Sequence, residues 1–386
     1  MTVAYIVPYS NSNTNPSINT MVPSNSAADL KALNDLITST QAILSQFKAT
    51  LSDTTTTTAN NQKPIASPPN PLDIFSDAAR LLKAHVTKLS LLVLNKPFTP
   101  TAVTKVLREL STTCLPAMIA GVQICCGQEK ATYGSLLGRE AAARTRRVFV
   151  ELEALVLEIR SVAATGIVAS GNGRDSLSTT GVVWESCDSL AELKALGMGG
   201  LAVQKAEEWR ETVKDAAEEL QEWAEGGDLE SEGQDALFDS EDEGVDGDDN
   251  DSFNGIFNAA NSLPADRVEL KELVGKSVEK LKKVEILYKA LVKRRLKTYK
   301  SVAAVEGRKS SAEYLDELMD GLKELPDSID DMVSTFYDLE EEDAKTALDE
   351  CLEKARGIAV LARLSYDGEE DEFSTWSKKW IEAVVG

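Results

Sequence analysis

Apolar side chains recur at every third or fourth position through most of the chain, and this spacing predicts α-helices. One run of this kind within residues 72–95 consists of Phe75, Ala78, Leu82, Val86, Leu89 and Val93. A second run within residues 264–305 consists of Val274, Val278, Leu281, Val284, Tyr288 and Leu291. Residues at these steps share one face of a helix, whereas a strand would alternate apolar and polar positions. We therefore expect long amphipathic helices.

The distribution of proline supports the same interpretation. Ten of the twelve prolines lie at or before Pro116, and the other two are Pro264 and Pro326. A proline inside a helix removes a hydrogen bond and clashes with the preceding turn, at a cost of about 3 kcal/mol. Long tracts without proline that are rich in Ala, Leu, Glu and Lys therefore favour an all-α fold.

Residues that end helices divide this pattern into segments. Gly166 ends one predicted helix, the glycines of 197–200 separate two others, and Pro326 separates a further two. The predicted helices span residues 27–51, 72–95, Pro100 to about 128, about 134–165, 182–196, 200–225, 264–305, 310–323, 327–338, 342–365 and 371–384.

Amphipathic helices bury their apolar stripes by packing on one another, so the predicted fold is two antiparallel helical bundles. Residues 7–25 and 53–71 are rich in Asn, Ser, Thr and Pro and too polar to bury. The predicted organisation is a disordered tail over 1–25, an N-terminal bundle over 26–225 that contains the flexible linker 53–71, an acidic disordered linker over 226–262, and a C-terminal bundle over 263–386.

The net charge of −22 is concentrated in one part of the chain. Residues 215–266 hold 18 acidic side chains and no basic one, which favours a solvated linker between the bundles or a docking segment for a basic partner. Its run from Asp246 resembles a calcium loop only superficially, because Asp251 and Phe257 stand where Gly and Glu are needed. Ser240 precedes three acidic residues and is a candidate phosphorylation site.

The chain is poor in the side chains that catalysis and metal binding use. It has one histidine, His85, and five dispersed cysteines without a C-x-x-C spacing. Proton-transfer dyads, zinc ribbons and disulfide frameworks all need more than this. We expect a protein that is not an enzyme and has no cofactor or metal, with His85 and the pair Cys125 and Cys126 in the core. No apolar run approaches 18 residues and the N-terminus lacks a signal sequence, so we expect no membrane insertion and an intracellular protein.

A basic segment follows the acidic one, with 12 basic and 4 acidic residues over 267–300. Its densest part contains Lys293, Arg294, Arg295 and Lys297, a pattern typical of nuclear import signals but also of a solvated helix face. Direct nucleic-acid binding is less favoured, because residues 301–386 carry a net charge of −14. Gly275-Lys276-Ser277 is not a phosphate-binding loop, since Leu270 occupies the position of the required glycine.

Several stretches, in order, resemble the cyclin-D-binding protein (GCIP) family. The best of them is Gly181-Val-Val-Trp184-Glu-Ser-Cys187-Asp188-Ser-Leu190. It is followed by Val213-Lys-Asp215-Ala-Ala-Glu-Glu-Leu220-Gln-Glu-Trp223 and by the acidic segment, and Leu325-Pro-Asp-Ser-Ile329-Asp330-Asp331-Met-Val is similar to a later family stretch. The chain departs from the family at Tyr337, which is followed by Asp338 and no proline.

The resemblance implies a regulator of cell-cycle progression and transcription in nucleus and cytoplasm. Its implied partners are cyclin D and helix-loop-helix transcription factors, its implied fold is two helical bundles of the vinculin or catenin type, and it implies no catalytic residue. Binding would sequester a partner's helix in a groove. The bundle pattern alone leaves a cytoskeletal or adhesion scaffold as the alternative. The oligomeric state is open at this stage.

Overall fold

A computed structural model describes residues 27–52, 68–165, 176–225, 263–264, 266–302 and 309–385. Every regular element within these ranges is helical, which confirms the predicted all-α class. The predicted N-terminal tail, nearly all of the acidic linker and Ser240 lie outside the described residues.

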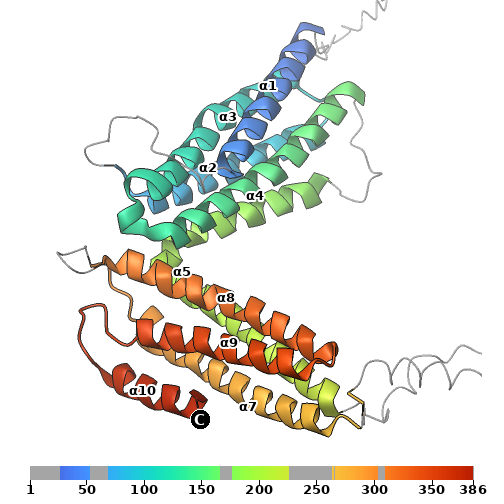
Figure 1. The fold of residues 1–386 in the computed structure, drawn as a ribbon. Helices are drawn as coiled ribbons and strands as arrows, with labels where there is room; N and C mark the ends of the chain where they lie inside the picture. Colours follow the sequence, from blue (N-terminus) through green and yellow to red (C-terminus); the bar gives the residue numbers. More distant parts are fainter. Residues whose placement is uncertain are drawn as a thin grey trace, which may run out of the picture.

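The helices form two groups (Figure 1). The first contains α1 (Ala27–Ser52), α2 (Pro71–Leu94), α3 (Pro100–Gln123), α4 (Lys130–Thr165) and the N-terminal half of α5 (Ser176–Glu225). A π-helical segment, η2 (Ile124–Gln128), joins α3 to α4. Helix α2 packs between α3 and α5, α4 packs on the other side of α5, and α1 covers α3 and α4. These contacts enclose the apolar stripes predicted from the sequence.

The second group contains the C-terminal half of α5 with α7 (Val268–Leu291), α8 (Ser311–Tyr337), α9 (Glu341–Leu361) and α10 (Glu372–Val385). Helix α7 continues into a π-helical segment, η3 (Val292–Leu296). Helices α8 and α9 pack on each other, α5 packs on α7 and α8, and α10 lies against α7 and α9.

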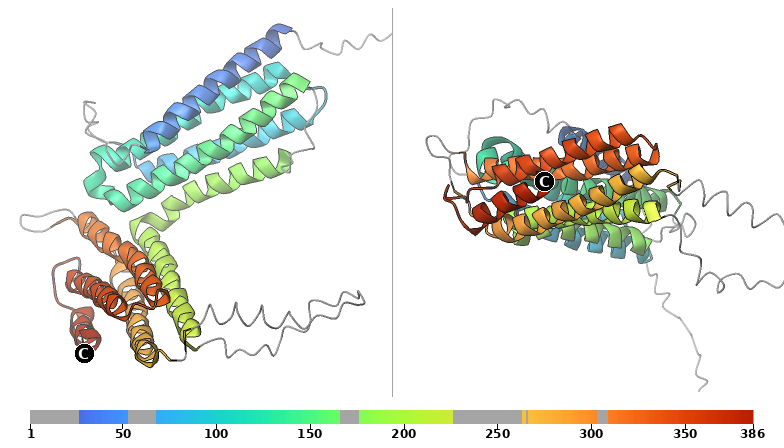
Figure 2. Two further views of the ribbon diagram at one scale, coloured as in Figure 1. Left: turned by 45° about the vertical axis from the view of Figure 1, so that its right-hand side comes forward. Right: turned by 60° about the horizontal axis from the view of Figure 1, so that its bottom comes forward.

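Helix α5 belongs to both groups, and this differs from the predicted division. Gly197 has φ 57° and ψ −167°, a backbone conformation that is almost restricted to glycine, and it kinks the helix. The two predicted helices 182–196 and 200–225 are the two halves of α5, and they diverge at this kink (Figure 2). The second half packs with α7 and α8, so the division between the groups falls near Gly197 and not at the predicted residue 225.

Pro326 does not break a helix, and the prediction of two helices over 310–323 and 327–338 was wrong. Helix α8 runs through it as one element. A proline at 326 cannot donate to the carbonyl of Leu322, four residues earlier. The buried Tyr288 hydroxyl donates to that carbonyl instead, at 2.5 Å. A side chain of α7 thus replaces the missing backbone donor.

One stretch, Pro100–Gly127, is long and apolar enough to cross a membrane. Half of its apolar window is buried among neighbouring helices, while Lys105 and Arg108 lie on its exposed side. Helices α1 and α2 pack along α3. Because a helix at the centre of a helical bundle has this same composition, its position in the fold accounts for its hydropathy.

Candidate partner-binding surface

The N-terminal half of α5 carries the best stretch of the family resemblance and lies between α2 and α4. Val183, Cys187 and Leu190 follow a helical period and are fully buried against these neighbours. Trp184 lies at the flank of this buried stripe, about a quarter turn from its centre, and is 37% exposed. Cys187 therefore serves the core, whereas Trp184 presents part of its ring to solvent.

Ion pairs hold this half of α5 against its neighbours. Asp188 binds Lys83 of α2 with both oxygens at 2.6 and 2.7 Å. Lys194 pairs with Asp73 near the start of α2 at 2.8 Å. Exposed pairs of this kind contribute little stability, about 0–1 kcal/mol each, so their main effect is on the register of the two helices.

Arg144 of α4 fixes the other side of α5. Its side chain is almost fully buried and donates to the Ser189 carbonyl at 2.6 Å and to Glu140 at 2.7 Å. A second arginine, Arg147, pairs with Glu185 at 3.1 Å. A buried guanidinium is tolerated only with several acceptors, and Arg144 has them.

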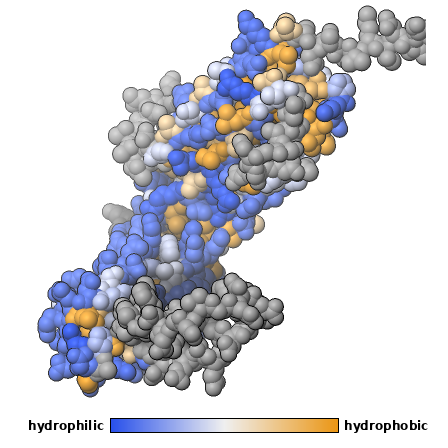
Figure 3. All heavy atoms as spheres, turned by 90° about the vertical axis from the view of Figure 1, so that its right-hand side faces the viewer, coloured by the Kyte–Doolittle hydropathy of each residue, from blue (hydrophilic) through white to orange (hydrophobic). Residues whose placement is uncertain are grey.

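The outer sides of α2, α5 and α4 carry exposed apolar side chains that the packing does not cover. We call them the outer apolar face, and they are Leu81, Leu91, Leu94, Val150, Leu157 and Trp184. Figure 3 shows apolar residues gathered over the first helix group among polar ones. Scattered surface leucines are ordinary, so the partly exposed Trp184 is the side chain that makes this part of the surface a candidate for contact with a partner.

The register of α2 and α5 places two of these side chains near each other. Ser90 and Thr180 are joined by a 2.5 Å hydrogen bond, and Lys83 and Asp188 by the ion pair described above. Trp184 lies midway between the two contacts. Leu91 is therefore about one helical turn, or ~6 Å along the axis, from the level of Trp184.

The thiols and the single imidazole are not arranged for chemistry. Burial raises the pKa of Cys125 and of Cys187 to about 12 and that of Cys351 to about 11. Thiols with such pKa values stay protonated at neutral pH and are poor nucleophiles. The Nδ1 atom of His85 lies 3.9 Å from the Glu109 carboxylate. Within the described residues, no three His, Cys, Asp or Glu side chains are grouped as metal ligands.

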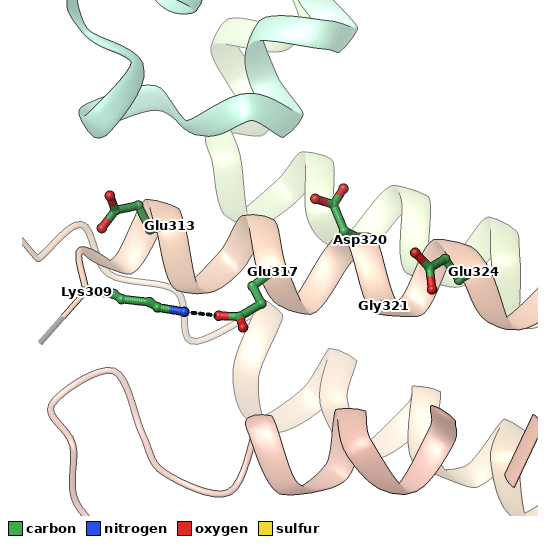
Figure 4. A pocket seen from close by; sticks show the side chains of 6 residues that line it. All are labelled: Lys309, Glu313, Glu317, Asp320, Gly321 and Glu324. Atoms are coloured by element: carbon green, nitrogen blue, oxygen red, sulfur yellow. Dashed lines mark hydrogen bonds and ion pairs between the residues drawn. The ribbon is translucent and has the colours of Figure 1, made fainter. Parts of the chain in front are cut away.

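Helix α8 presents an acidic edge. Glu313, Glu317, Asp320 and Glu324 follow one another at helical spacing beside a shallow cavity of about 520 Å³ (Figure 4). Lys309 pairs with Glu317 at 2.6 Å, so part of this charge is compensated. The family-motif residues Asp330 and Asp331 are exposed further along the same helix, and Asp215 is exposed on the C-terminal half of α5. The structure does not bring these three together with Trp184 and Asp188 in one pocket.

The basic cluster is only partly a surface feature. Arg295 is 1% exposed, binds both oxygens of Asp371 at 2.8 and 2.9 Å, and lies 4.5 Å from the centre of the Phe373 ring. It joins η3 to the start of α10, and nuclear import through this cluster stays a prediction. Lys293, Arg294 and Lys297 are exposed, and Arg294 pairs with Glu372 at 2.6 Å.

The sequence pattern alone does not identify the outer apolar face. Leu81 and Leu91 fall outside the apolar stripe that starts at Phe75. This mismatch in helical phase indicates apolar side chains on the outer side of the helix. The periodicity of α2 thus marks its outer side as well as the side that faces the core.

Comparison with known proteins agrees with the resemblance. Residues 75–226 match the family model described as Grap2 and cyclin-D-interacting, N-terminal. An uncharacterized protein of Schizosaccharomyces pombe is 27% identical over 328 residues, which covers 84% of this chain and 88% of the yeast protein. The matched range begins at Phe75 in α2 and ends just after α5, so it contains the Trp184 stretch and both halves of α5. Over this N-terminal segment the chain is therefore similar to the Grap2 and cyclin-D-interacting (GCIP) family.

Proposed function

We propose that the protein is a non-enzymatic regulator that binds a cyclin-D-type partner through the outer apolar face. The family description supports the class of partner. The location of the binding surface rests on one observation, the exposure of Trp184. This residue lies in the matched segment and keeps more than a third of its surface exposed, although it is flanked by a fully packed core.

The axial spacing of two side chains on this surface suits a partner's amphipathic helix. The junction of α2 and α5 presents Leu91 and Trp184 about one turn apart, which matches the spacing of apolar side chains on a helix. Partly buried tryptophans dominate the binding energy of many interfaces, because they bury a large area at a small loss of side-chain entropy. Binding here would withhold the partner's helix from its other assemblies.

The finer functions are proposals from the family resemblance. They are restraint of cell-cycle progression, binding of helix-loop-helix transcription factors, and residence in both nucleus and cytoplasm. The family match favours regulation over the scaffold alternative. If import uses the basic cluster, its exposed members Lys293, Arg294 and Lys297 carry it, because Arg295 is occupied by Asp371.

Affinity measurements on surface variants test the proposal. Trp184→Ala should weaken binding of purified cyclin D by roughly 10-fold or more, and Leu91→Ala should weaken it less, as expected when an aromatic anchor is removed. Val360→Ala on α9 is the matched control, since Val360 is also an exposed apolar residue but lies in the second helix group. Equal affinities for wild type and Trp184→Ala, with helical circular dichroism retained, would refute this site.

A further inference from the structure

The two helix groups meet at a polar contact that caps a helix. Helix α4 is kinked at Gly134, which has φ 70°, and its regular part starts with Ser135. The Asp316 carboxylate of α8 accepts hydrogen bonds from the backbone N–H of Ser135 at 2.5 Å and of Leu136 at 2.9 Å. The first N–H groups of a helix lack partners within the helix and carry partial positive charge. Asp316 supplies both an acceptor and an opposite charge.

The contact depends on the absence of a side chain at 134. A Cβ built on Gly134 would lie 2.9 Å from one Asp316 oxygen and 3.1 Å from the Met198 methyl group, in addition to requiring the positive φ. The kink therefore opens the helix start and gives the carboxylate room to reach it. This arrangement is specific to the junction and is not needed to build either group.

Helices α4 and α8 also pack on each other here, and few other hydrogen bonds or ion pairs cross the junction in the described residues. Arg139 of α4 pairs with Asp320 of α8 at 2.7 Å, Lys205 lies 4.0 Å from Glu140, and the Ser310 hydroxyl donates to the Ala131 carbonyl at 3.5 Å. The chain itself crosses at the kink of α5, where Gly197 occupies a backbone conformation that other residues rarely adopt. The junction thus combines a pivot with a small number of polar contacts, the geometry of a hinge.

We propose that Asp316 acts as a latch that holds the two helix groups at one angle, and that the groups pivot about Gly197 when it is released. The pivot has a functional consequence, because α5 carries Trp184 and Asp188 on one side of Gly197 and Asp215 on the other. The latch sets the distance between these parts of the family-matched segment. This inference does not depend on the identity of the partner.

Distances between spin labels in the full chain test the latch. Labels are attached to cysteines that replace Thr112 of α3 and Lys345 of α9, which are both exposed. The unsubstituted chain, treated in the same way, measures labelling of the native thiols. The wild-type latch predicts one narrow distance distribution. Asp316→Ala removes the hydrogen-bond acceptor, and Ser135→Asp places a second negative charge beside Asp316. Each variant should increase the width of the distance distribution about two-fold or shift its maximum.

Two controls separate the latch from general effects of substitution. Ser135→Ala leaves the backbone N–H in place, and Asp327→Asn changes an exposed carboxylate on the same helix. Both should retain the narrow distribution. Release should leave the helical circular dichroism unchanged, because the helices of each group pack mainly on one another. An unchanged distribution in folded Asp316→Ala, or loss of helix in both Asp316→Ala and Ser135→Asp, would overturn the proposal.

Discussion

At the scale of single residues, the hydrogen bond from Tyr288 to the Leu322 carbonyl is what allows α8 to pass through Pro326. Tyr288→Phe should leave that carbonyl without a donor in a buried position and lower the free energy of unfolding by about 1–3 kcal/mol. Denaturant unfolding followed by circular dichroism measures this loss.

Pro326→Ala provides the control for this prediction. Alanine at 326 restores the backbone N–H that bonds to Leu322, so Tyr288→Phe should cost clearly less in the Pro326→Ala background than alone. Additive losses in the double variant would show that the tyrosine hydroxyl acts in some other way.

A second prediction at this scale concerns the ion pair of the buried Arg295 with Asp371. Its bonds hold the pKa of Asp371 at about 2, below the usual value of 3.8. A carboxyl group whose pKa is lower in the folded state than in the unfolded state stabilises the fold at pH values above its ordinary pKa. This stabilisation is lost as the pH falls toward the pKa of the folded state. Asp371→Asn should therefore be less stable than wild type at pH 7, by roughly 1–2 kcal/mol after solvent screening of this partly exposed carboxylate.

The pH dependence distinguishes the charge from simple packing. The difference in unfolding free energy between wild type and Asp371→Asn should shrink between about pH 4 and pH 2, since wild-type Asp371 becomes protonated in this window. A difference that stays constant down to pH 2 would assign the effect to packing alone.

At the scale of the element, the kink of α5 depends on one glycine. Gly197→Ala forces a side chain into φ 57° and ψ −167° and should cost about 1–3 kcal/mol in stability. Gly181→Ala is the control in the same helix, because a Cβ there has open space and ordinary helical geometry. It should stabilise by up to ~1 kcal/mol. Thermal unfolding of both variants compares them, and equal shifts would contradict the role of the kink.

The positions of the helices could be predicted because the apolar period is a local property. The predicted 27–51 and 72–95 correspond to observed 27–52 and 71–94. Pro326 could not be interpreted in this way, because the compensating hydroxyl of Tyr288 comes from another helix, 38 positions earlier. Likewise, the run of basic residues around Arg295 does not reveal that the Arg295 side chain is buried and paired with Asp371.

At the scale of the whole molecule, the shared helix α5 predicts how the chain can be divided. Its C-terminal half buries Leu201, Val213 and Leu220 within the second helix group. A fragment of residues 198–386 should therefore unfold cooperatively with a helical circular dichroism spectrum, whereas residues 226–386 lack one helix of the group and should not.

The complementary fragments sharpen this test. Residues 27–225 should expose the apolar side of the second half of α5 and self-associate more than residues 27–196, as judged by light scattering. Cooperative unfolding of 226–386 as a stable monomer would support a division at residue 225 instead.

The sequence by itself determined that the chain is helical, approximately where the helices begin and end, and which family its 75–226 segment resembles. These properties follow from neighbouring residues along one helix and from motif order. Only the tertiary structure decided which group each half of α5 joins, that Trp184 is exposed while Cys187 is buried, and that Asp316 caps α4. An apolar stripe specifies that a helix must pack, but the partner on which it packs depends on contacts between residues far apart in the chain.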